Sequence, residues 1–228
     1  MASIIPNLII SDFDMTFFNF KEVDNKIINK IFEGHKFVLK LDCLLWKINS
    51  LGIIGNSMAG LKLRLFIYSM LTFFTIHIKY NYIFKEYEKM YKNLALRKYK
   101  RKTWLINQIN ARGYWFRILT NNKFASELGI SDIIYTKSKR AFLKEYPPEY
   151  LIGDNFWDDY RNTPKGTKYI NVGDGIISRL SLKNVSCIKN MYEIFEVLGW
   201  LEKIGIKLLY NNTYFSLIIL KNVNIYII

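Results

Sequence analysis

The chain has 228 residues, of which half are hydrophobic and 16% aromatic, so it is long enough to bury one sizeable core or a core with a smaller inserted module. This composition excludes a disordered tail and a collagen-like fibre. The formal net charge of +14 suits a polyanionic partner such as nucleic acid or an anionic membrane surface, but the joint richness in Lys, Ile, Asn, Tyr and Phe favours AT-rich codons as its source.

The first predicted element is a short buried strand over residues 7–11, an apolar run that ends in acidic residues. The apolar stretch before these acids is interrupted by Pro6 and is too short for a secretory signal peptide. Cys43 and Cys187 are the only cysteines; they show neither metal spacing nor a disulfide framework and are expected to be core thiols. Together these features predict a cytoplasmic protein.

Residues 21–102 are expected to form a separate helical module, because they contain long runs without proline. Glycines divide these runs into several helices. The most apolar stretch, residues 65–78, is about fourteen residues long, whereas crossing a bilayer takes about twenty. We therefore expect a buried or interfacial helix and no stable membrane span. A face that touches a membrane or a lipid phosphate is the alternative. The charged run 97–102 predicts a solvated helix end, so nucleic acid is not the expected partner.

Strands and helices then alternate quickly, which is typical of a parallel α/β sheet. Residues 190–201 predict an amphipathic helix that packs on this sheet. The β-branched and aromatic tail, residues 204–228, predicts a hairpin or a pair of edge strands. The expected strands of the alternating part are residues 115–120, 133–136, 150–152 and 169–172, and the expected helices are residues 123–128 and 138–146.

Two carboxylates, Asp12 and Asp14, stand two positions apart directly after the first strand. The two-residue period of extended backbone aims both to one side while Phe13 points away. An isolated Asp-x-Asp is ordinarily a strand-end turn, but ligand sites of open α/β sheets lie beyond the carboxyl ends of the strands. Other predicted strands lead into polar residues there as well: Thr120 with Asn121, then Lys139, then Asp154 after Gly153.

Further acids follow Gly153 in the run GDNFWDD, residues 153–159. Hard oxygen ligands of this kind suit Mg²⁺, and the glycine permits an unusual backbone conformation. A second glycine-aspartate pair, at residues 173–174, is interpreted as a simple turn because no acid follows it at the corresponding spacing.

These motifs resemble those of the haloacid dehalogenase-like (HAD) superfamily, in particular its phosphatases similar to phosphoserine phosphatase. That family is marked by DxDx[TV] after the first strand, a Ser or Thr ending the second, a Lys before the fourth and GDxxxD after it. The chain has DFDMT, ILT, KRAFLK and GDNFWDD in that order. The resemblance covers residues 7–20 and 104–200, and Met15 stands where many members have glycine.

The resemblance implies an α/β protein with a Rossmann-like core and a parallel sheet, formed by residues 1–20 and 104–203. The insertion between the first and second motifs, residues 21–103, would be an α-helical cap of the C1 type. Residues 204–228 would form a β-rich tail outside the family's pattern.

The resemblance also implies a Mg²⁺-dependent phosphatase that hydrolyses a small phosphorylated metabolite through an aspartyl-phosphate. Asp12 would be the nucleophile and Asp14 the general acid and base. Asp14 also argues against dehalogenase chemistry, because family dehalogenases lack this second acid. The other implied roles are phosphate binding by Thr120, Asn121 and Lys139, Mg²⁺ binding by Asp12, the Asp14 backbone carbonyl and Asp154, and supporting positions for Thr16 and Asp158, with Asp159 as a neighbouring candidate.

Several alternatives stay open at this point. Lys137 competes with Lys139 for the lysine role, and Lys139 is preferred because the family's lysine typically opens a helix with a leucine four positions later, here Leu143. The motifs do not separate hydrolysis from phosphoryl transfer to an alcohol. A basic module that binds nucleic acid or membrane through a non-catalytic fold of this kind is a further hypothesis.

Overall fold

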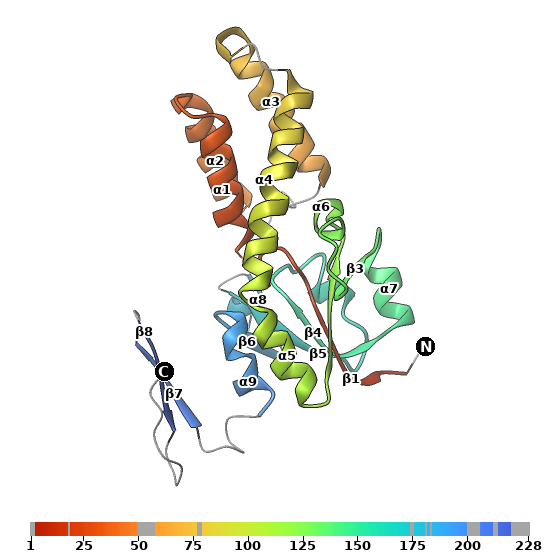
Figure 1. Cartoon of the computed structure of the whole chain (residues 1–228). Helices are drawn as coiled ribbons and strands as arrows, with labels where there is room; N and C mark the ends of the chain where they lie inside the picture. Colours follow the sequence, from red (N-terminus) through yellow and green to blue (C-terminus); the bar gives the residue numbers. More distant parts are fainter. Residues whose placement is uncertain are drawn as a thin grey trace.

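The computed structural model describes residues 3–17, 19–49, 58–76, 79–173, 176–180, 182, 184–199, 206–211 and 214–219. It has an α/β fold with an N-terminal helical region and a six-stranded parallel sheet (Figure 1). The strand order β3-β2-β1-β4-β5-β6 is the Rossmann-like one, with β1 in the interior of the sheet. The strands are β1 Ile5–Ser11, β2 Trp115–Thr120, β3 Ile133–Tyr135, β4 Pro148–Gly153, β5 Lys168–Val172 and β6 Val185–Ile188.

The second half of the central strand β1, residues 8–11, is buried, as expected for its short apolar run in the interior of a parallel sheet. Ile9 packs into a cluster on one face of the sheet and Ile10 into a second cluster on the other, because successive side chains of a strand point in opposite directions. The strand pairs in parallel with β2 on one side and β4 on the other. The carboxyl ends of β1, β2 and β4 therefore lie side by side.

The helical region lies between β1 and β2 in the chain. Its first helix begins after Asn19, whose side chain caps the helix by accepting a hydrogen bond from the Glu22 backbone N–H at 3.1 Å. The fourth helix contacts the first and third and continues toward the sheet, where α5 follows it (Figure 1). The helices are α1 Phe20–Ile31, α2 Lys36–Asn49, α3 Met58–Ile76, α4 Tyr80–Lys100 and α5 Thr103–Ala111.

One hydrophobic cluster joins the helical region to the sheet. Along α4, Tyr87, Tyr91 and Ala95 recur every four residues and are fully buried, as expected for one face of a helix. They belong to the same cluster as Phe17, which follows β1, and Phe116 of β2. The helical region is thus packed against the part of the chain that follows β1.

The remaining elements are short. The expected helix over 190–201 is a 3₁₀ turn followed by one helical turn, and the tail contains an antiparallel pair of strands, β7 and β8. The turn expected between these two strands lies partly outside the described residues. These elements are α6 Lys123–Ser126, α7 Lys139–Glu145, η1 Tyr160–Asn162, α8 Ile176–Arg179, η2 Met191–Glu193, α9 Ile194–Val197, β7 Ile206–Asn211 and β8 Tyr214–Ile219.

Two sequence-based expectations concern the cysteines and membrane spans. The prediction of core thiols is wrong, because Cys43 and Cys187 are both exposed, the first on the outer face of α2 and the second on β6. In the part of the chain that the structure describes, none of the helices combines the length and the apolar character needed to cross a bilayer.

Candidate functional site

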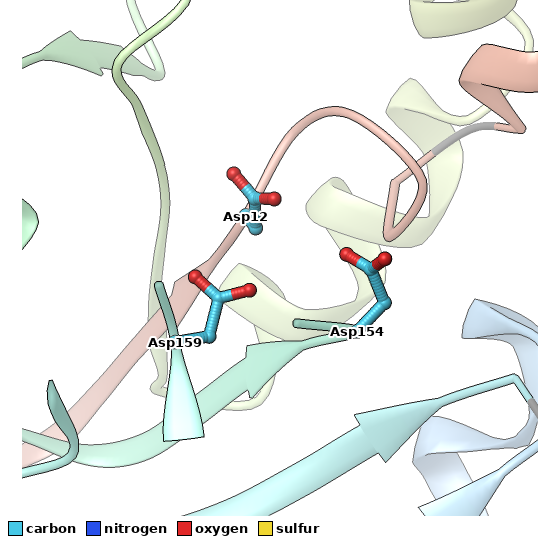
Figure 2. Close-up of side chains that lie close together, drawn as sticks. All are labelled: Asp12, Asp154 and Asp159. Atoms are coloured by element: carbon cyan, nitrogen blue, oxygen red, sulfur yellow. The ribbon is translucent and has the colours of Figure 1, made fainter. Parts of the chain in front are cut away.

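Three carboxylates meet at the carboxyl edge of the sheet (Figure 2). Asp12 directly follows β1, and its backbone N–H continues the pairing with β4 by donating to the Ile152 carbonyl oxygen at 2.8 Å. Asp154 directly follows β4, and Asp159 lies five residues further on. One carboxylate oxygen from each of the three acids lies within 4.8 Å of the other two, so they form a group that could hold a metal ion.

Asp159 reaches this group because the chain turns back after β4. The Asp159 backbone N–H donates to the Asn155 carbonyl oxygen at 3.1 Å, which closes one helical turn. The Asp159 carboxylate then packs directly on Gly153, where an added Cβ would lie 2.5 Å from Asp159 Oδ2. Glycine at position 153 is therefore a steric requirement of the site.

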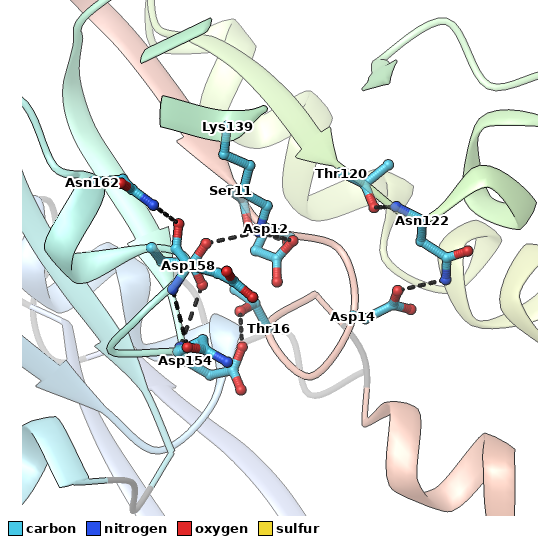
Figure 3. Close-up of polar contacts among 12 residues, drawn as sticks. Ser11, Asp12, Asp14, Thr16, Thr120, Asn122, Lys139, Asp154, Asp158 and Asn162 are labelled. Atoms are coloured by element: carbon cyan, nitrogen blue, oxygen red, sulfur yellow. Dashed lines mark hydrogen bonds and ion pairs between the residues drawn. The ribbon is translucent and has the colours of Figure 1, made fainter. Parts of the chain in front are cut away.

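Lys139 is the cation that links two of the acids (Figure 3). It is the first residue of α7, which is capped by Ser138. Its Nζ lies 2.8 Å from Asp12 Oδ1 and 2.7 Å from Asp159 Oδ1, and its side chain is 8% exposed. Burial alone would lower the pKa of Lys139, but the carboxylates of Asp12 and Asp159 raise it above its ordinary value. The ammonium group is therefore charged, and it contacts both carboxylates.

One lysine does not balance three buried acids. Burial raises the pKa of Asp12, and the nearby Asp159 and Asp154 raise it further against the opposing effect of Lys139. Burial and Asp159 raise the pKa of Asp154 to about 7, although Thr16 Oγ1 donates to Asp154 Oδ1 at 3.1 Å. A divalent cation would relieve this excess of negative charge, and the all-oxygen donor set fits a hard ion such as Mg²⁺.

Asp14 lies apart from this group, and its carboxylate is held from the opposite side (Figure 3). The Tyr91 hydroxyl of α4 donates to Asp14 Oδ1 at 2.7 Å, and Asn122 Nδ2 donates to Asp14 Oδ2, also at 2.7 Å. Burial raises the pKa of Asp14, and these two hydrogen bonds lower it. A helix of the N-terminal region thus contacts the second acid of the DFDMT motif directly.

Asn122 joins the second strand to this arrangement. Its backbone N–H donates to Thr120 Oγ1 at 3.0 Å, and its side-chain oxygen accepts from the Phe124 backbone N–H at 3.0 Å as the cap of α6. Thr120 is 1% exposed at the end of β2. Its hydroxyl therefore faces the same edge of the sheet as the acids.

The structure brings together most of the residues singled out from the sequence. In two cases the residue that makes the contact is the next one in the chain. Asp158 is exposed, and Asp159 contacts Lys139 in its place, because the turn after β4 returns at residue 159. Asn121 is exposed, whereas Asn122 contacts Asp14. Lys137, the alternative lysine, is also exposed. The other predicted site residues lie at the carboxyl edge of the sheet: Asp12, Asp14, Thr16, Thr120, Lys139 and Asp154.

Sequence reasoning passed over Tyr91, Asn122 and the central position of Asp159. The GDNFWDD run contains two adjacent acids, Asp158 and Asp159, and only the geometry of the turn decides which of them reaches the site. Asn122 has a local signal, since it precedes a short helix as a capping residue does. Tyr91 has none, because 77 positions separate it from Asp14.

Comparisons with known proteins assign no family. No protein-family model matches the chain, and no curated protein has a significant match to it. The geometry of the site is therefore the basis for inferring a function.

Proposed function

We propose that the chain is a Mg²⁺-dependent phosphatase of the HAD type, which hydrolyses a phosphate monoester through an aspartyl-phosphate on Asp12. The observation behind this proposal is the buried group of Asp12, Asp154 and Asp159, joined by Lys139 at the carboxyl edge of a Rossmann-like sheet. In this proposal the helical region between β1 and β2 is the cap, and the substrate is a small phosphorylated metabolite.

The chemistry would proceed in two displacements. A carboxylate oxygen of Asp12 attacks phosphorus, the ester P–O bond breaks, and Asp14 donates its proton to the leaving alkoxide oxygen. The Asp14 carboxylate then takes a proton from water, whose oxygen attacks the phosphorus of the aspartyl-phosphate. The acyl P–O bond breaks, inorganic phosphate leaves, and the Asp12 carboxylate is restored.

The surrounding side chains would supply positioning and charge. Lys139 neutralises negative charge on the phosphoryl oxygens, and Thr120 donates a hydrogen bond to one of them. Asp12, Asp154 and Asp159 offer the oxygen ligands for Mg²⁺, which supplies positive charge for the phosphoryl group. Burial raises the pKa of Asp14, which suits a carboxyl group that must hold a proton before it donates it.

The backbone at Met15 supports the resemblance to this family. Met15 has φ of 64°, in the left-handed region that glycine adopts without steric cost. Many members of the resembling family have glycine at this position. The turn after Asp14 therefore has the conformation that such a glycine would take, although this chain fills it with a larger residue.

The test is phosphate release from a panel of phosphorylated metabolites and a generic aryl phosphate, with and without Mg²⁺. The wild type is compared with Asp12→Asn and with Asp158→Asn, a matched control that removes an exposed carboxylate beside the site. We expect Mg²⁺-dependent release that Asp12→Asn abolishes and Asp158→Asn retains.

Added alcohols extend the same assay to phosphoryl transfer. A phosphorylated alcohol among the products would assign the enzyme to the phosphotransferases that use the same aspartyl-phosphate. Absence of release from every substrate, in folded protein loaded with Mg²⁺, would overturn the proposal and favour a binding module.

A further inference from the structure

The outward side of α3 is unusually apolar. Six large hydrophobic side chains of this helix, which we call the α3 face, are exposed to solvent, and two of them, Leu63 and Met70, are each 60% exposed. At 100° per residue they cover one broad side of the helix. The α3 face consists of Leu63, Phe66, Ile67, Met70, Leu71 and Phe73.

The inward side of α3 contains both apolar residues, Leu65 and Tyr68, and polar ones. Ser69 and Thr72 are buried among the helices, and their hydroxyls donate to carbonyl oxygens of the same helix, those of Phe66 and Tyr68, at 2.7 and 2.8 Å. A surface helix of a water-soluble protein ordinarily turns its polar side outward. The outward side of α3 is instead apolar, which indicates that it contacts something less polar than water.

The adjacent helix α2 adds positive charge. Its exposed residues include Phe37 and Leu44 together with Lys36, Lys40 and Lys47. Residues 36–79 contain five lysines and one arginine against a single acid, Asp42. That acid is buried and paired with Arg64 at 3.3 Å. The solvent-facing charge of α2 and α3 is therefore strongly positive.

We propose that the α3 face, with the lysines of α2, docks on the surface of an anionic lipid bilayer. The apolar side chains would enter the boundary between headgroups and acyl chains, and the lysines would contact anionic headgroups. Lysine stems can lie along apolar surface while their ammonium groups reach the headgroups. The helix α3 lies at the end of the helical region away from the sheet, so the carboxyl edge of the sheet need not be covered by docking (Figure 1).

Charge favours this partner over a second copy of the chain. Two copies joined through the same face would bring their α2 lysines together, and like charges repel. An anionic bilayer complements both the apolar and the basic residues of the surface. The proposal is independent of the chemistry at Asp12.

The test is co-sedimentation of the full chain with vesicles of phosphatidylcholine alone or of phosphatidylcholine with phosphatidylglycerol, at low and at physiological salt. We expect binding to the anionic vesicles that weakens as salt rises. The double variant Leu63→Ser/Met70→Ser should bind at least about tenfold more weakly, since it removes two inserted side chains. The control Trp115→Ser, which removes a side chain that is 67% exposed on β2, should bind as the wild type does.

A second double variant, Phe66→Ser/Ile67→Ser, guards against a folding defect in the first, and circular dichroism checks both. Sedimentation velocity measures self-association of the same samples without lipid. The proposal is overturned if the wild type ignores anionic vesicles, or if folded variants bind them equally well. A wild-type dimer that the variants convert to monomer, without vesicle binding, would assign the α3 face to a second copy.

Discussion

Lys139 is the residue on which the buried acids depend. Its ammonium group is shared between Asp12 and Asp159, and a buried charge without such partners would be strongly unfavourable. Asp154 is held instead by the hydroxyl of Thr16. Asp154 thus has a different partner from Asp12 and Asp159. Single substitutions should therefore distinguish what each acid contributes to Mg²⁺ binding.

Asp159→Asn is expected to lower the affinity for Mg²⁺ and the Mg²⁺-dependent phosphate release about 10–100-fold, the usual effect of losing a group that orients a metal site. The substitution removes a negative charge from the group and weakens the hold on Lys139. Calorimetric titration of Mg²⁺ and the phosphate assay measure the two effects. Asp158→Asn is the control, and an equal loss in both variants would contradict the central position of Asp159.

Tyr91→Phe is expected to move the pH profile of kcat/KM to higher pH. Burial and Asp14 raise the pKa of Tyr91, so its hydroxyl stays protonated and donates to Asp14. That hydrogen bond lowers the pKa of Asp14, and its loss should raise it. The matched control on the same helix is Tyr99→Phe, whose hydroxyl donates to Asp132 at 2.8 Å. Identical profiles for the wild type and Tyr91→Phe would exclude a role of Tyr91 in positioning Asp14.

Among the elements, α4 connects the helical region to the candidate site. It packs on α1 and α3 at one end, contacts α6 near the site, and leads into α5. The helices that it joins are also held by a buried ionic network, in which Arg64 of α3 contacts Asp24 of α1 and Asp42 of α2. Tyr87 of α4 donates a hydrogen bond to Asp24. Four helices therefore meet around one arginine.

Arg64→Met is expected to lower the free energy of unfolding by about 3–5 kcal/mol, because it leaves Asp24 and Asp42 buried without their cation. Urea denaturation followed by circular dichroism measures this change. The control Lys26→Met removes an exposed pair with Glu22 and should cost at most about 1 kcal/mol. A similar small cost for both variants would show that the network contributes little to stability.

At the scale of the whole molecule, the sheet and the helical region share a hydrophobic cluster that includes Phe17, Tyr91 and Phe116. The polar site lies where this shared core meets the carboxyl edge of the sheet. Burial raises the pKa values of Asp12, Asp14 and Asp154. The stability of the fold and the charge state of the site should therefore be linked.

Mg²⁺ is expected to raise the melting temperature more at about pH 8 than at about pH 6. The pKa of Asp154 is about 7 in the folded protein, above its unfolded value, so the stability from its bound proton is present at low pH and is lost as pH rises through about 7. Above that pH the ionised carboxylate is free to bind Mg²⁺. Thermal unfolding with and without Mg²⁺ measures the effect, and Asp154→Asn should weaken the pH dependence. Equal shifts at both pH values would argue against this linkage.

Part of the fold was predictable because its signals are local. The expected strand over residues 115–120 has the bounds of β2, and short apolar runs likewise located β1, β4 and β5 to within a few residues. The end of the chain was less predictable: the apolar positions of residues 190–201 suggested one helix, but the chain forms only η2 and the single turn of α9. Periodicity does not contain the packing that ends a helix early.

The sequence by itself determined the alternation of strands and helices and the presence of acids where the strands end, because these depend on periodicity and on neighbouring residues. Only the tertiary structure decided between Asp158 and Asp159 and between Asn121 and Asn122, since a turn of the backbone sets which neighbour points inward. It also decided the contact of Tyr91 with Asp14 and the outward direction of the α3 face. Both features depend on how segments that are distant in the sequence pack together, which a local sequence pattern does not predict.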